Sequence, residues 1–126
     1  MACDGTSLYV ADSGNNRVQK LRLADGAHLG TVGKADCSCG DGERQFSWPS
    51  GLCVVGGALY VCDQRNHRIV VLDTDLNWRY TIGREGSGDG DFLRPTFVTA
   101  HGGELYITDD GNHRVQAWRP RPATPS

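Results

Sequence analysis

Cys37 and Cys39 have the spacing that most directly suggests chemistry in this sequence. Two thiolates separated by one residue can bind a zinc ion or form a strained disulfide. A zinc site needs about four ligands, however, and no second pair of cysteines or histidines stands at a suitable spacing. We therefore expect no bound metal and no cofactor, and Cys37 and Cys39 are the residues to test if a metal is present.

A second set of polar residues recurs three times. In each copy an Asp is followed by an Asn three residues later and by an Arg five residues later. Asp and Asn in a tight turn usually bind nearby backbone N–H groups. Because the set is present in every copy, we expect it to be structural, with the arginines paired to carboxylates or carbonyl groups between repeats. The three sets are Asp12, Asn15 and Arg17; Asp63, Asn66 and Arg68; and Asp109, Asn112 and Arg114.

Other arrangements that could support catalysis are incomplete. His67 and His113 occupy the same place in their copies, so they belong to the repeat and do not form a catalytic pair. The glycine-rich segment 86–91 is superficially similar to a calcium loop, but it lacks the alternating ligands and the closing Glu of an EF-hand. No glycine-rich segment is followed by Lys-Ser or Lys-Thr, as a phosphate-binding loop requires. We therefore expect a protein that is not an enzyme.

The elements that must position these residues repeat with them. The three Asp residues lie 51 and 46 residues apart, and Pro49 and Pro95 each precede their Asp by 14 residues. Each unit reads as four short extended segments, such as 52–55, the segment from Leu59, 68–73 and 78–83, with paired glycines between the first two. No segment keeps apolar residues at a spacing of 3.6 residues. Four short antiparallel strands, repeated at this period, are typical of a β-propeller blade.

This pattern resembles the NHL repeat, a blade unit named after an Asn-His-Leu type of signature. The match is carried by Asn66-His67-Arg68-Ile69 and Asn112-His113-Arg114-Val115, while Asn15-Asn16-Arg17-Val18 differs by one residue. The resemblance covers residues 1–119 and implies an all-β fold: an incomplete ring of about three NHL-type blades, with the first and last truncated. We expect blades at about 1–33, 48–83 and 94–119, interblade loops at 34–47 and 84–93, and a Pro-rich tail at 120–126.

Fewer than three complete blades cannot close a ring alone, because propellers typically have 4–8 blades. Two explanations follow from the sequence. The chain is a fragment of a larger propeller protein, or copies of it form a homo-oligomer that completes the ring. We favour the fragment.

Composition narrows the classes of partner and the compartment. The 126 residues carry 13 Lys and Arg against 15 Asp and Glu, a net charge of −2, without the basic excess usual in nucleic-acid-binding proteins. No apolar run approaches the length that spans a membrane. With no secretory signal either, we expect a cytoplasmic protein whose five cysteines are thiols, with Cys3, Cys53 and Cys62 as small buried residues on strands.

The leading functional hypothesis is a noncatalytic scaffold that binds a protein partner through the loops on one propeller face. Contacts are expected where the repeats differ, at Asp36, Arg44, Gln64, Arg65, Arg84 and Asp91. The resemblance also leaves two alternatives open. One is a truncated metal-dependent propeller enzyme, similar to the amidating lyases or lactonases.

The other alternative is an RNA-binding NHL module, of the kind attached to tripartite-motif ubiquitin ligases. A small basic and aromatic patch could then form from Arg79, Arg84, Arg94, Trp78 and Phe97. Three of the thirteen basic residues are the repeated motif arginines, so few remain for an RNA surface. RNA is therefore a possible partner that we do not favour.

Overall fold

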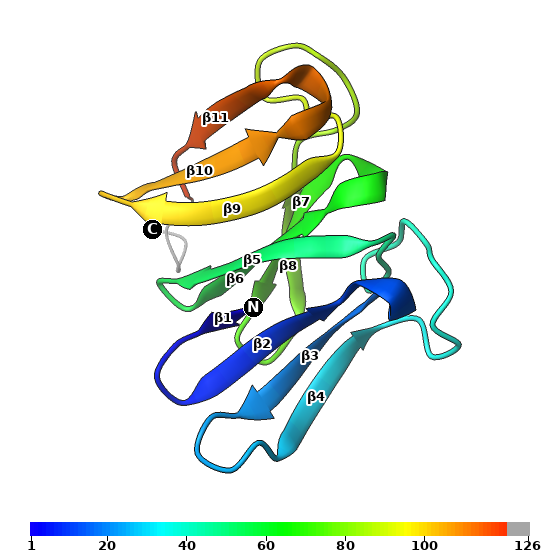
Figure 1. The fold of residues 1–126 in the computed structure, drawn as a ribbon, viewed down its shortest axis with the longest axis vertical. Coiled ribbons are helices and arrows are strands. Elements are labelled where there is room, and N and C mark those ends of the chain that lie inside the picture. The colour runs from blue at the N-terminus through cyan, green and yellow to red at the C-terminus, as the bar shows by residue number, and fades with distance from the viewer. Residues whose placement is uncertain (121–126) are drawn as a thin grey trace.

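The structure, a computed structural model, describes residues 1–120 as three antiparallel β-sheets joined by loops (Figure 1). Within this range there is no α-helix, and no helix could span a membrane. The expected all-β fold, with three propeller-type blades in an incomplete ring, is thereby confirmed. The tail expected at 120–126 lies, apart from Pro120, outside the described residues.

Each sheet follows the chain in simple up-and-down order. The first blade has four strands, β1 (Ala2–Cys3), β2 (Ser7–Asp12), β3 (Arg17–Arg22) and β4 (His28–Gly33). The second has β5 (Pro49–Val55), β6 (Ala58–Asp63), β7 (Arg68–Asp73) and β8 (Trp78–Ile82). The third has β9 (Pro95–His101), β10 (Glu104–Asp109) and β11 (Arg114–Trp118). The first, second and third expected segments of the second repeat correspond to β5, β6 and β7.

The hydrophobic core consists of two layers, one on each face of the second blade. Successive side chains of a strand point to opposite faces, so Leu59 and Val61 of β6 enter one layer and Tyr60 and Cys62 enter the other. All six residues of β6 are buried. The second blade is therefore the one whose two faces are both covered.

Each interblade loop adds an aromatic ring to the layer that it borders. Phe46 precedes β5 and is fully buried in the first layer, while Phe92 precedes β9 and is fully buried in the second. Gly83 has a φ of +78°, and a Cβ placed on it would lie 2.3 Å from the Phe92 ring. One end of each interblade loop therefore belongs to the core, and the other end lies at the surface.

The first strands of the blades lie side by side and line one groove. β1, β5 and β9 border a groove of about 420 Å³. Gly51 of β5 comes so close to β9 that an added Cβ would lie 2.6 Å from the Phe97 Cα, and the Ser50 hydroxyl donates to the Thr96 carbonyl at 3.0 Å. This contact fixes the second and third blades to each other at the inner edge.

Candidate interaction surface

Three equivalent turns lie at one end of the blades, which we call the turn end (Figure 1). In each blade the second strand is followed by one turn of 3₁₀ helix, at Ser13–Asn15, Gln64–Asn66 and Asp110–Asn112. The next residue is left-handed in every copy, with φ of 54° to 55° at Asn16, His67 and His113. Asn and His tolerate this conformation better than most residues, which explains why the signature places them there.

In the second repeat the motif residues hold the loop at 34–47. The Asp63 carboxylate accepts from Arg68 Nε at 2.8 Å and from the backbone N–H of Ser47 at 2.8 Å. The remaining Arg68 nitrogens donate to the carbonyls of Asp41, Gly42 and Gln45, and Asn66 donates to the Gly40 carbonyl. One guanidinium and one amide therefore fix the path of the loop through its backbone.

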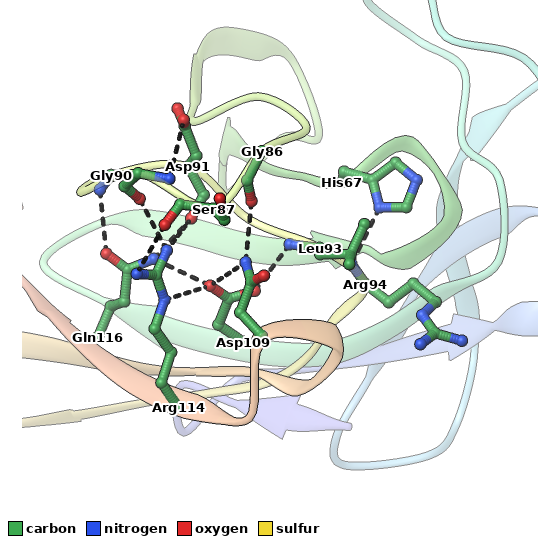
Figure 2. A network of polar contacts seen from close by, with 12 residues as sticks. His67, Gly86, Ser87, Gly90, Asp91, Leu93, Arg94, Asp109, Arg114 and Gln116 are labelled. Atoms are coloured by element: carbon green, nitrogen blue, oxygen red, sulfur yellow. Dashed lines mark hydrogen bonds and ion pairs between the residues drawn. The ribbon is translucent and has the colours of Figure 1, made fainter.

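The third repeat repeats this network on the loop at 84–93 (Figure 2). Arg114 Nε donates to Asp109 at 2.7 Å, and its other nitrogens donate to the carbonyls of Ser87, Gly88 and Asp91. Asn112 donates to the Gly86 carbonyl at 2.8 Å, and the Leu93 N–H donates to Asp109 at 2.7 Å. The carbonyls of the loop that is superficially similar to a calcium site thus converge on Arg114.

In the first repeat the same side chains have different partners. Arg17 Nε donates to Asp12 at 2.7 Å, and Asn15 and Gln19 also donate to that carboxylate. Arg17 then reaches the Cys37 sulfur at 3.8 Å. The Asp12 side chain is 26% exposed, whereas Asp63 and Asp109 are fully buried.

The three carboxyl groups differ in pKa accordingly. The hydrogen bond from Arg17, with help from Asn15, lowers the pKa of Asp12. Burial raises the pKa of Asp63, and its hydrogen bonds with Asn66, Ser47 and Arg68 offset this only in part. Burial also acts to raise the pKa of Asp109, but the hydrogen bonds from Leu93, Asn112 and Arg114 outweigh it and lower the pKa.

In the first two turns the left-handed residue also joins its blade to the next. Asn16 Oδ1 accepts the N–H of Trp48 at 2.8 Å, and His67 Nδ1 accepts the N–H of Arg94 at 2.9 Å. Trp48 and Arg94 each precede the proline that begins an inner strand. The middle residue of the signature is therefore a junction residue between repeats.

Comparison with known proteins identifies the repeat. The family model described as NHL repeat matches residues 46–72 and 92–118, which contain the second and third networks. The second and third repeats of the chain are NHL repeats. NHL repeat-containing protein 2 of Gallus gallus is 38% identical over 74 residues, covering 54% of this chain and 10% of that protein. The chain thus spans about one tenth of the length of this curated relative.

Solved structures share the fold of these NHL repeats. An auxiliary nutrient binding protein from Bacteroides ovatus superposes with a TM-score of 0.74 at 22% identity, covering 93% of this chain and 35% of that one. A streptogramin B lyase superposes with a TM-score of 0.60 at 17% identity, covering 90% of this chain and 37% of that one. At these identities the likeness shows the fold alone.

Four of the six predicted contact residues lie in the second turn or in the loop at 84–93. Arg65 and Arg84 border one groove of about 480 Å³ with His67. Arg84 is highly exposed and pairs with Asp91 at 3.4 Å, a surface ion pair of small energy. Gln64 is half-buried in the second turn.

The other two predicted contacts, Asp36 and Arg44, are engaged within the protein. Asp36 is exposed and accepts the hydroxyl and N–H of Ser38. The Arg44 guanidinium donates to the Leu76 carbonyl at 3.3 Å. Neither is brought into the groove that holds Arg65 and Arg84.

Trp48 is a turn-end residue that the sequence analysis did not single out. Its ring is exposed, and the guanidinium carbon of Arg65 lies 4.7 Å from the ring centroid. The sequence does repeat a residue directly before the proline, Trp48 in one repeat and Arg94 in the next, and this position could have drawn attention to Trp48. The role of Trp48 depends on its stacking partner Arg65, however, and residue spacing does not reveal that partner.

The basic and aromatic patch considered for RNA is not one surface. Trp78 pairs with Leu72 and begins β8, whereas Ile82 pairs with Ile69 near the turn end. At about 3.3 Å per residue, Trp78 lies about 13 Å along β8 from Ile82, and Arg84 follows the end of that strand. The prediction that Trp78 and Arg79 combine with Arg84 and Arg94 is wrong, because β8 carries them toward the opposite end.

The five cysteines are free thiols, but their burial differs from expectation. Cys62 is fully buried and burial raises its pKa, and Cys53 is half-buried. Cys3 is exposed, so its predicted burial is wrong; it lies on the two-residue strand β1, at the edge of the first sheet. Cys37 and Cys39 belong to no group of three or more candidate metal ligands within residues 1–120.

Proposed function

We propose that this chain is a noncatalytic protein-interaction scaffold whose turn end contacts a protein partner. The observation that supports this is the anchoring of both interblade loops by their backbone carbonyls, through Arg68 and Arg114. A loop held by its backbone keeps its side chains available at fixed positions. Variable loops on a rigid scaffold are the usual construction of a binding surface.

The use of the polar residues favours binding over catalysis. The motif carboxylates and arginines are paired with each other and with loop carbonyls, so they are occupied in holding the blades. His67 uses Nδ1 to accept the Arg94 N–H, which is a junction role. The side chains that differ between repeats, including Gln64, Arg65 and Arg84, remain for recognition.

Photocrosslinking tests this proposal. A benzoylphenylalanine at Gln64 should crosslink a protein that the same group at Val55, which is 40% exposed at the hairpin end, does not capture. The captured protein is then purified and its binding to the chain is measured, with Arg65→Ala and Arg84→Ala as variants. Equal capture at both positions, or binding insensitive to both variants, would contradict a turn-end interface.

A second copy of the chain is a further candidate partner. On the outer face of the third blade, Phe97 is 56% and Val115 is 62% exposed, whereas their counterparts Gly51 and Ile69 are buried. A sheet face that is covered in one repeat and exposed in the next is suited to association. Light scattering across a concentration series should show a dimer that Val115→Asp dissociates; a monomer at all concentrations would exclude it.

A further inference from the structure

The turn end carries two arginines whose charges are not used inside the protein. The side chains of Arg65 and Arg94 are exposed, and within residues 1–120 neither guanidinium makes a hydrogen bond or an ion pair. By contrast, the arginines of the three motifs are all paired to carboxylates. These two unpaired guanidinium groups are the feature that points to a ligand.

Contacts with neighbouring residues hold the Arg65 side chain and the Arg94 backbone in place. The Arg65 guanidinium stacks on Trp48, and its backbone N–H donates to the Ser47 carbonyl at 3.0 Å. Arg94 has a left-handed backbone with φ of 52°, fixed by the hydrogen bond of its N–H to His67. Figure 2 shows the Arg94 side chain extending away from the Asp109 network, with His67 beside its backbone. Such prior ordering lowers the entropic cost of binding.

The four residues are connected to one another through the second turn. Trp48 and Arg94 directly precede the inner strands β5 and β9, and Arg65 and His67 lie in the turn between β6 and β7. Trp48 contacts Arg65, and His67 binds Arg94. We call Trp48, Arg65, His67 and Arg94 the inner-rim cluster.

The charges around the cluster limit what can bind it. The loops next to it carry acidic residues, and Asp41 and Glu85 border the groove that contains Arg65. A long polyphosphate backbone requires many basic contacts, more than the two unpaired arginines supply. One or two carboxylates on a short segment need only the two arginines, which can each bind a carboxylate through paired N–H groups.

We propose that the inner-rim cluster binds a short acidic segment of a protein partner, with Arg65 and Arg94 taking its carboxylates. This rests on the proposed interaction function and names the chemistry of the partner. Trp48 is a positioning residue, because its ring holds the Arg65 guanidinium over one face. On this basis the turn end prefers short segments that carry Asp or Glu over the same segments with neutral side chains.

Binding of a fluorescein-labelled peptide of alternating Glu and Ser, measured by fluorescence anisotropy, tests this. The same peptide with Gln for Glu should not bind. Arg65→Gln and Arg94→Gln should each weaken binding about tenfold, and Trp48→Ala should weaken it although both charges remain. Arg22→Gln, an exposed arginine paired with Asp25, is the matched control and should bind as the unaltered chain does.

Three results would overturn the proposal. The first is no binding of the Glu peptide at low salt by a chain whose circular dichroism and unfolding transition are intact. The second is equal binding of the Gln peptide, and the third is a preference for oligouridine that depends on the same arginines. Crosslinking at Gln64 that persists in the double variant Arg65→Gln/Arg94→Gln would leave the scaffold function standing while removing this site from it.

Discussion

The first and second repeats contain the same Asp, Asn and Arg, but these residues differ in burial and in hydrogen-bond partners between the two repeats. In the second repeat Asp63 is fully buried, and Arg68 connects it to three carbonyls of the preceding loop. In the first repeat Asp12 and Arg17 are 26% and 32% exposed, and Arg17 has one weak contact to a sulfur besides its ion pair. The sequence motif is the same in both repeats, but we expect its contribution to the free energy of unfolding to depend on how deeply it is buried.

This difference in burial and partners indicates that the motif serves to hold an interblade loop. An exposed ion pair contributes little, because water solvates both charges and the side chains lose entropy. A buried pair is strongly coupled to its surroundings, because each charge depends on the other and on every hydrogen bond around it. The buried, strongly coupled pair is found in the second and third repeats, in which an interblade loop crosses the motif.

Arg68→Ala should show the largest difference between the repeats. The substitution leaves the buried Asp63 carboxylate without its cation and releases three loop carbonyls, so we expect a loss of about 3–5 kcal/mol in the free energy of unfolding. Arg17→Ala should lose much less, because the Asp12 carboxylate reaches water. Urea unfolding of both variants measures this, and Arg68→Lys should recover part of the loss. Equal losses for Arg68→Ala and Arg17→Ala would show that burial does not determine how much the motif contributes to stability.

Asn66→Ala should have a smaller effect in the same direction. The Asn66 amide donates to the Gly40 carbonyl at 2.7 Å and to Asp63 at 2.9 Å, so its removal leaves buried acceptors unsatisfied and costs about 1–3 kcal/mol. Asn15 is exposed, and within residues 1–120 its amide bonds only the Asp12 carboxylate, so Asn15→Ala should change stability by less than about 0.5 kcal/mol. The urea midpoints of the two variants report this directly. A loss at Asn15 as large as at Asn66 would contradict it.

Acid should affect the two carboxyl groups with opposite sign. The lowered pKa of Asp12 means that its contribution to stability is present above its ordinary value of 3.8 and is lost as pH falls through the folded pKa. The raised pKa of Asp63 means that the folded protein takes up this proton at a higher pH than the unfolded chain, so acidification below that pKa favours the fold at this site.

Asp12→Asn should therefore reduce the loss of stability on acidification, and Asp63→Asn should increase it. Unfolding free energies measured from pH 6 to pH 2 give the slope for each variant, with the unaltered chain as reference. Parallel slopes for all three proteins would show that neither carboxyl has a shifted pKa in the fold.

Much of this comparison can be predicted from residue spacing, and the remainder has clear physical causes. The period and the Asp-Asn-Arg spacing predict the strands, since the segment expected at 68–73 is β7. Spacing also predicts that arginines reach carbonyls, but it does not show which loop lies over which motif. The stacking of Arg65 on Trp48 and the exposure of Cys3 depend on tertiary neighbours, which a local pattern does not contain.

Cysteine labelling gives the smallest expected effect and compares the repeats without a mutation. Cys3 of the first repeat is exposed and should react with a thiol reagent rapidly. Cys62 of the second repeat is fully buried on β6, and its burial raises the pKa of the thiol, so little reactive thiolate is present and access requires opening of the blade. Mass spectrometry of digests after short labelling should find Cys3 and Cys39 modified and Cys62 intact until urea unfolds the chain. Labelling of Cys62 at the rate of Cys3 in the absence of urea would show that the second blade opens as readily as the edge of the first, which the two covered faces of β6 argue against.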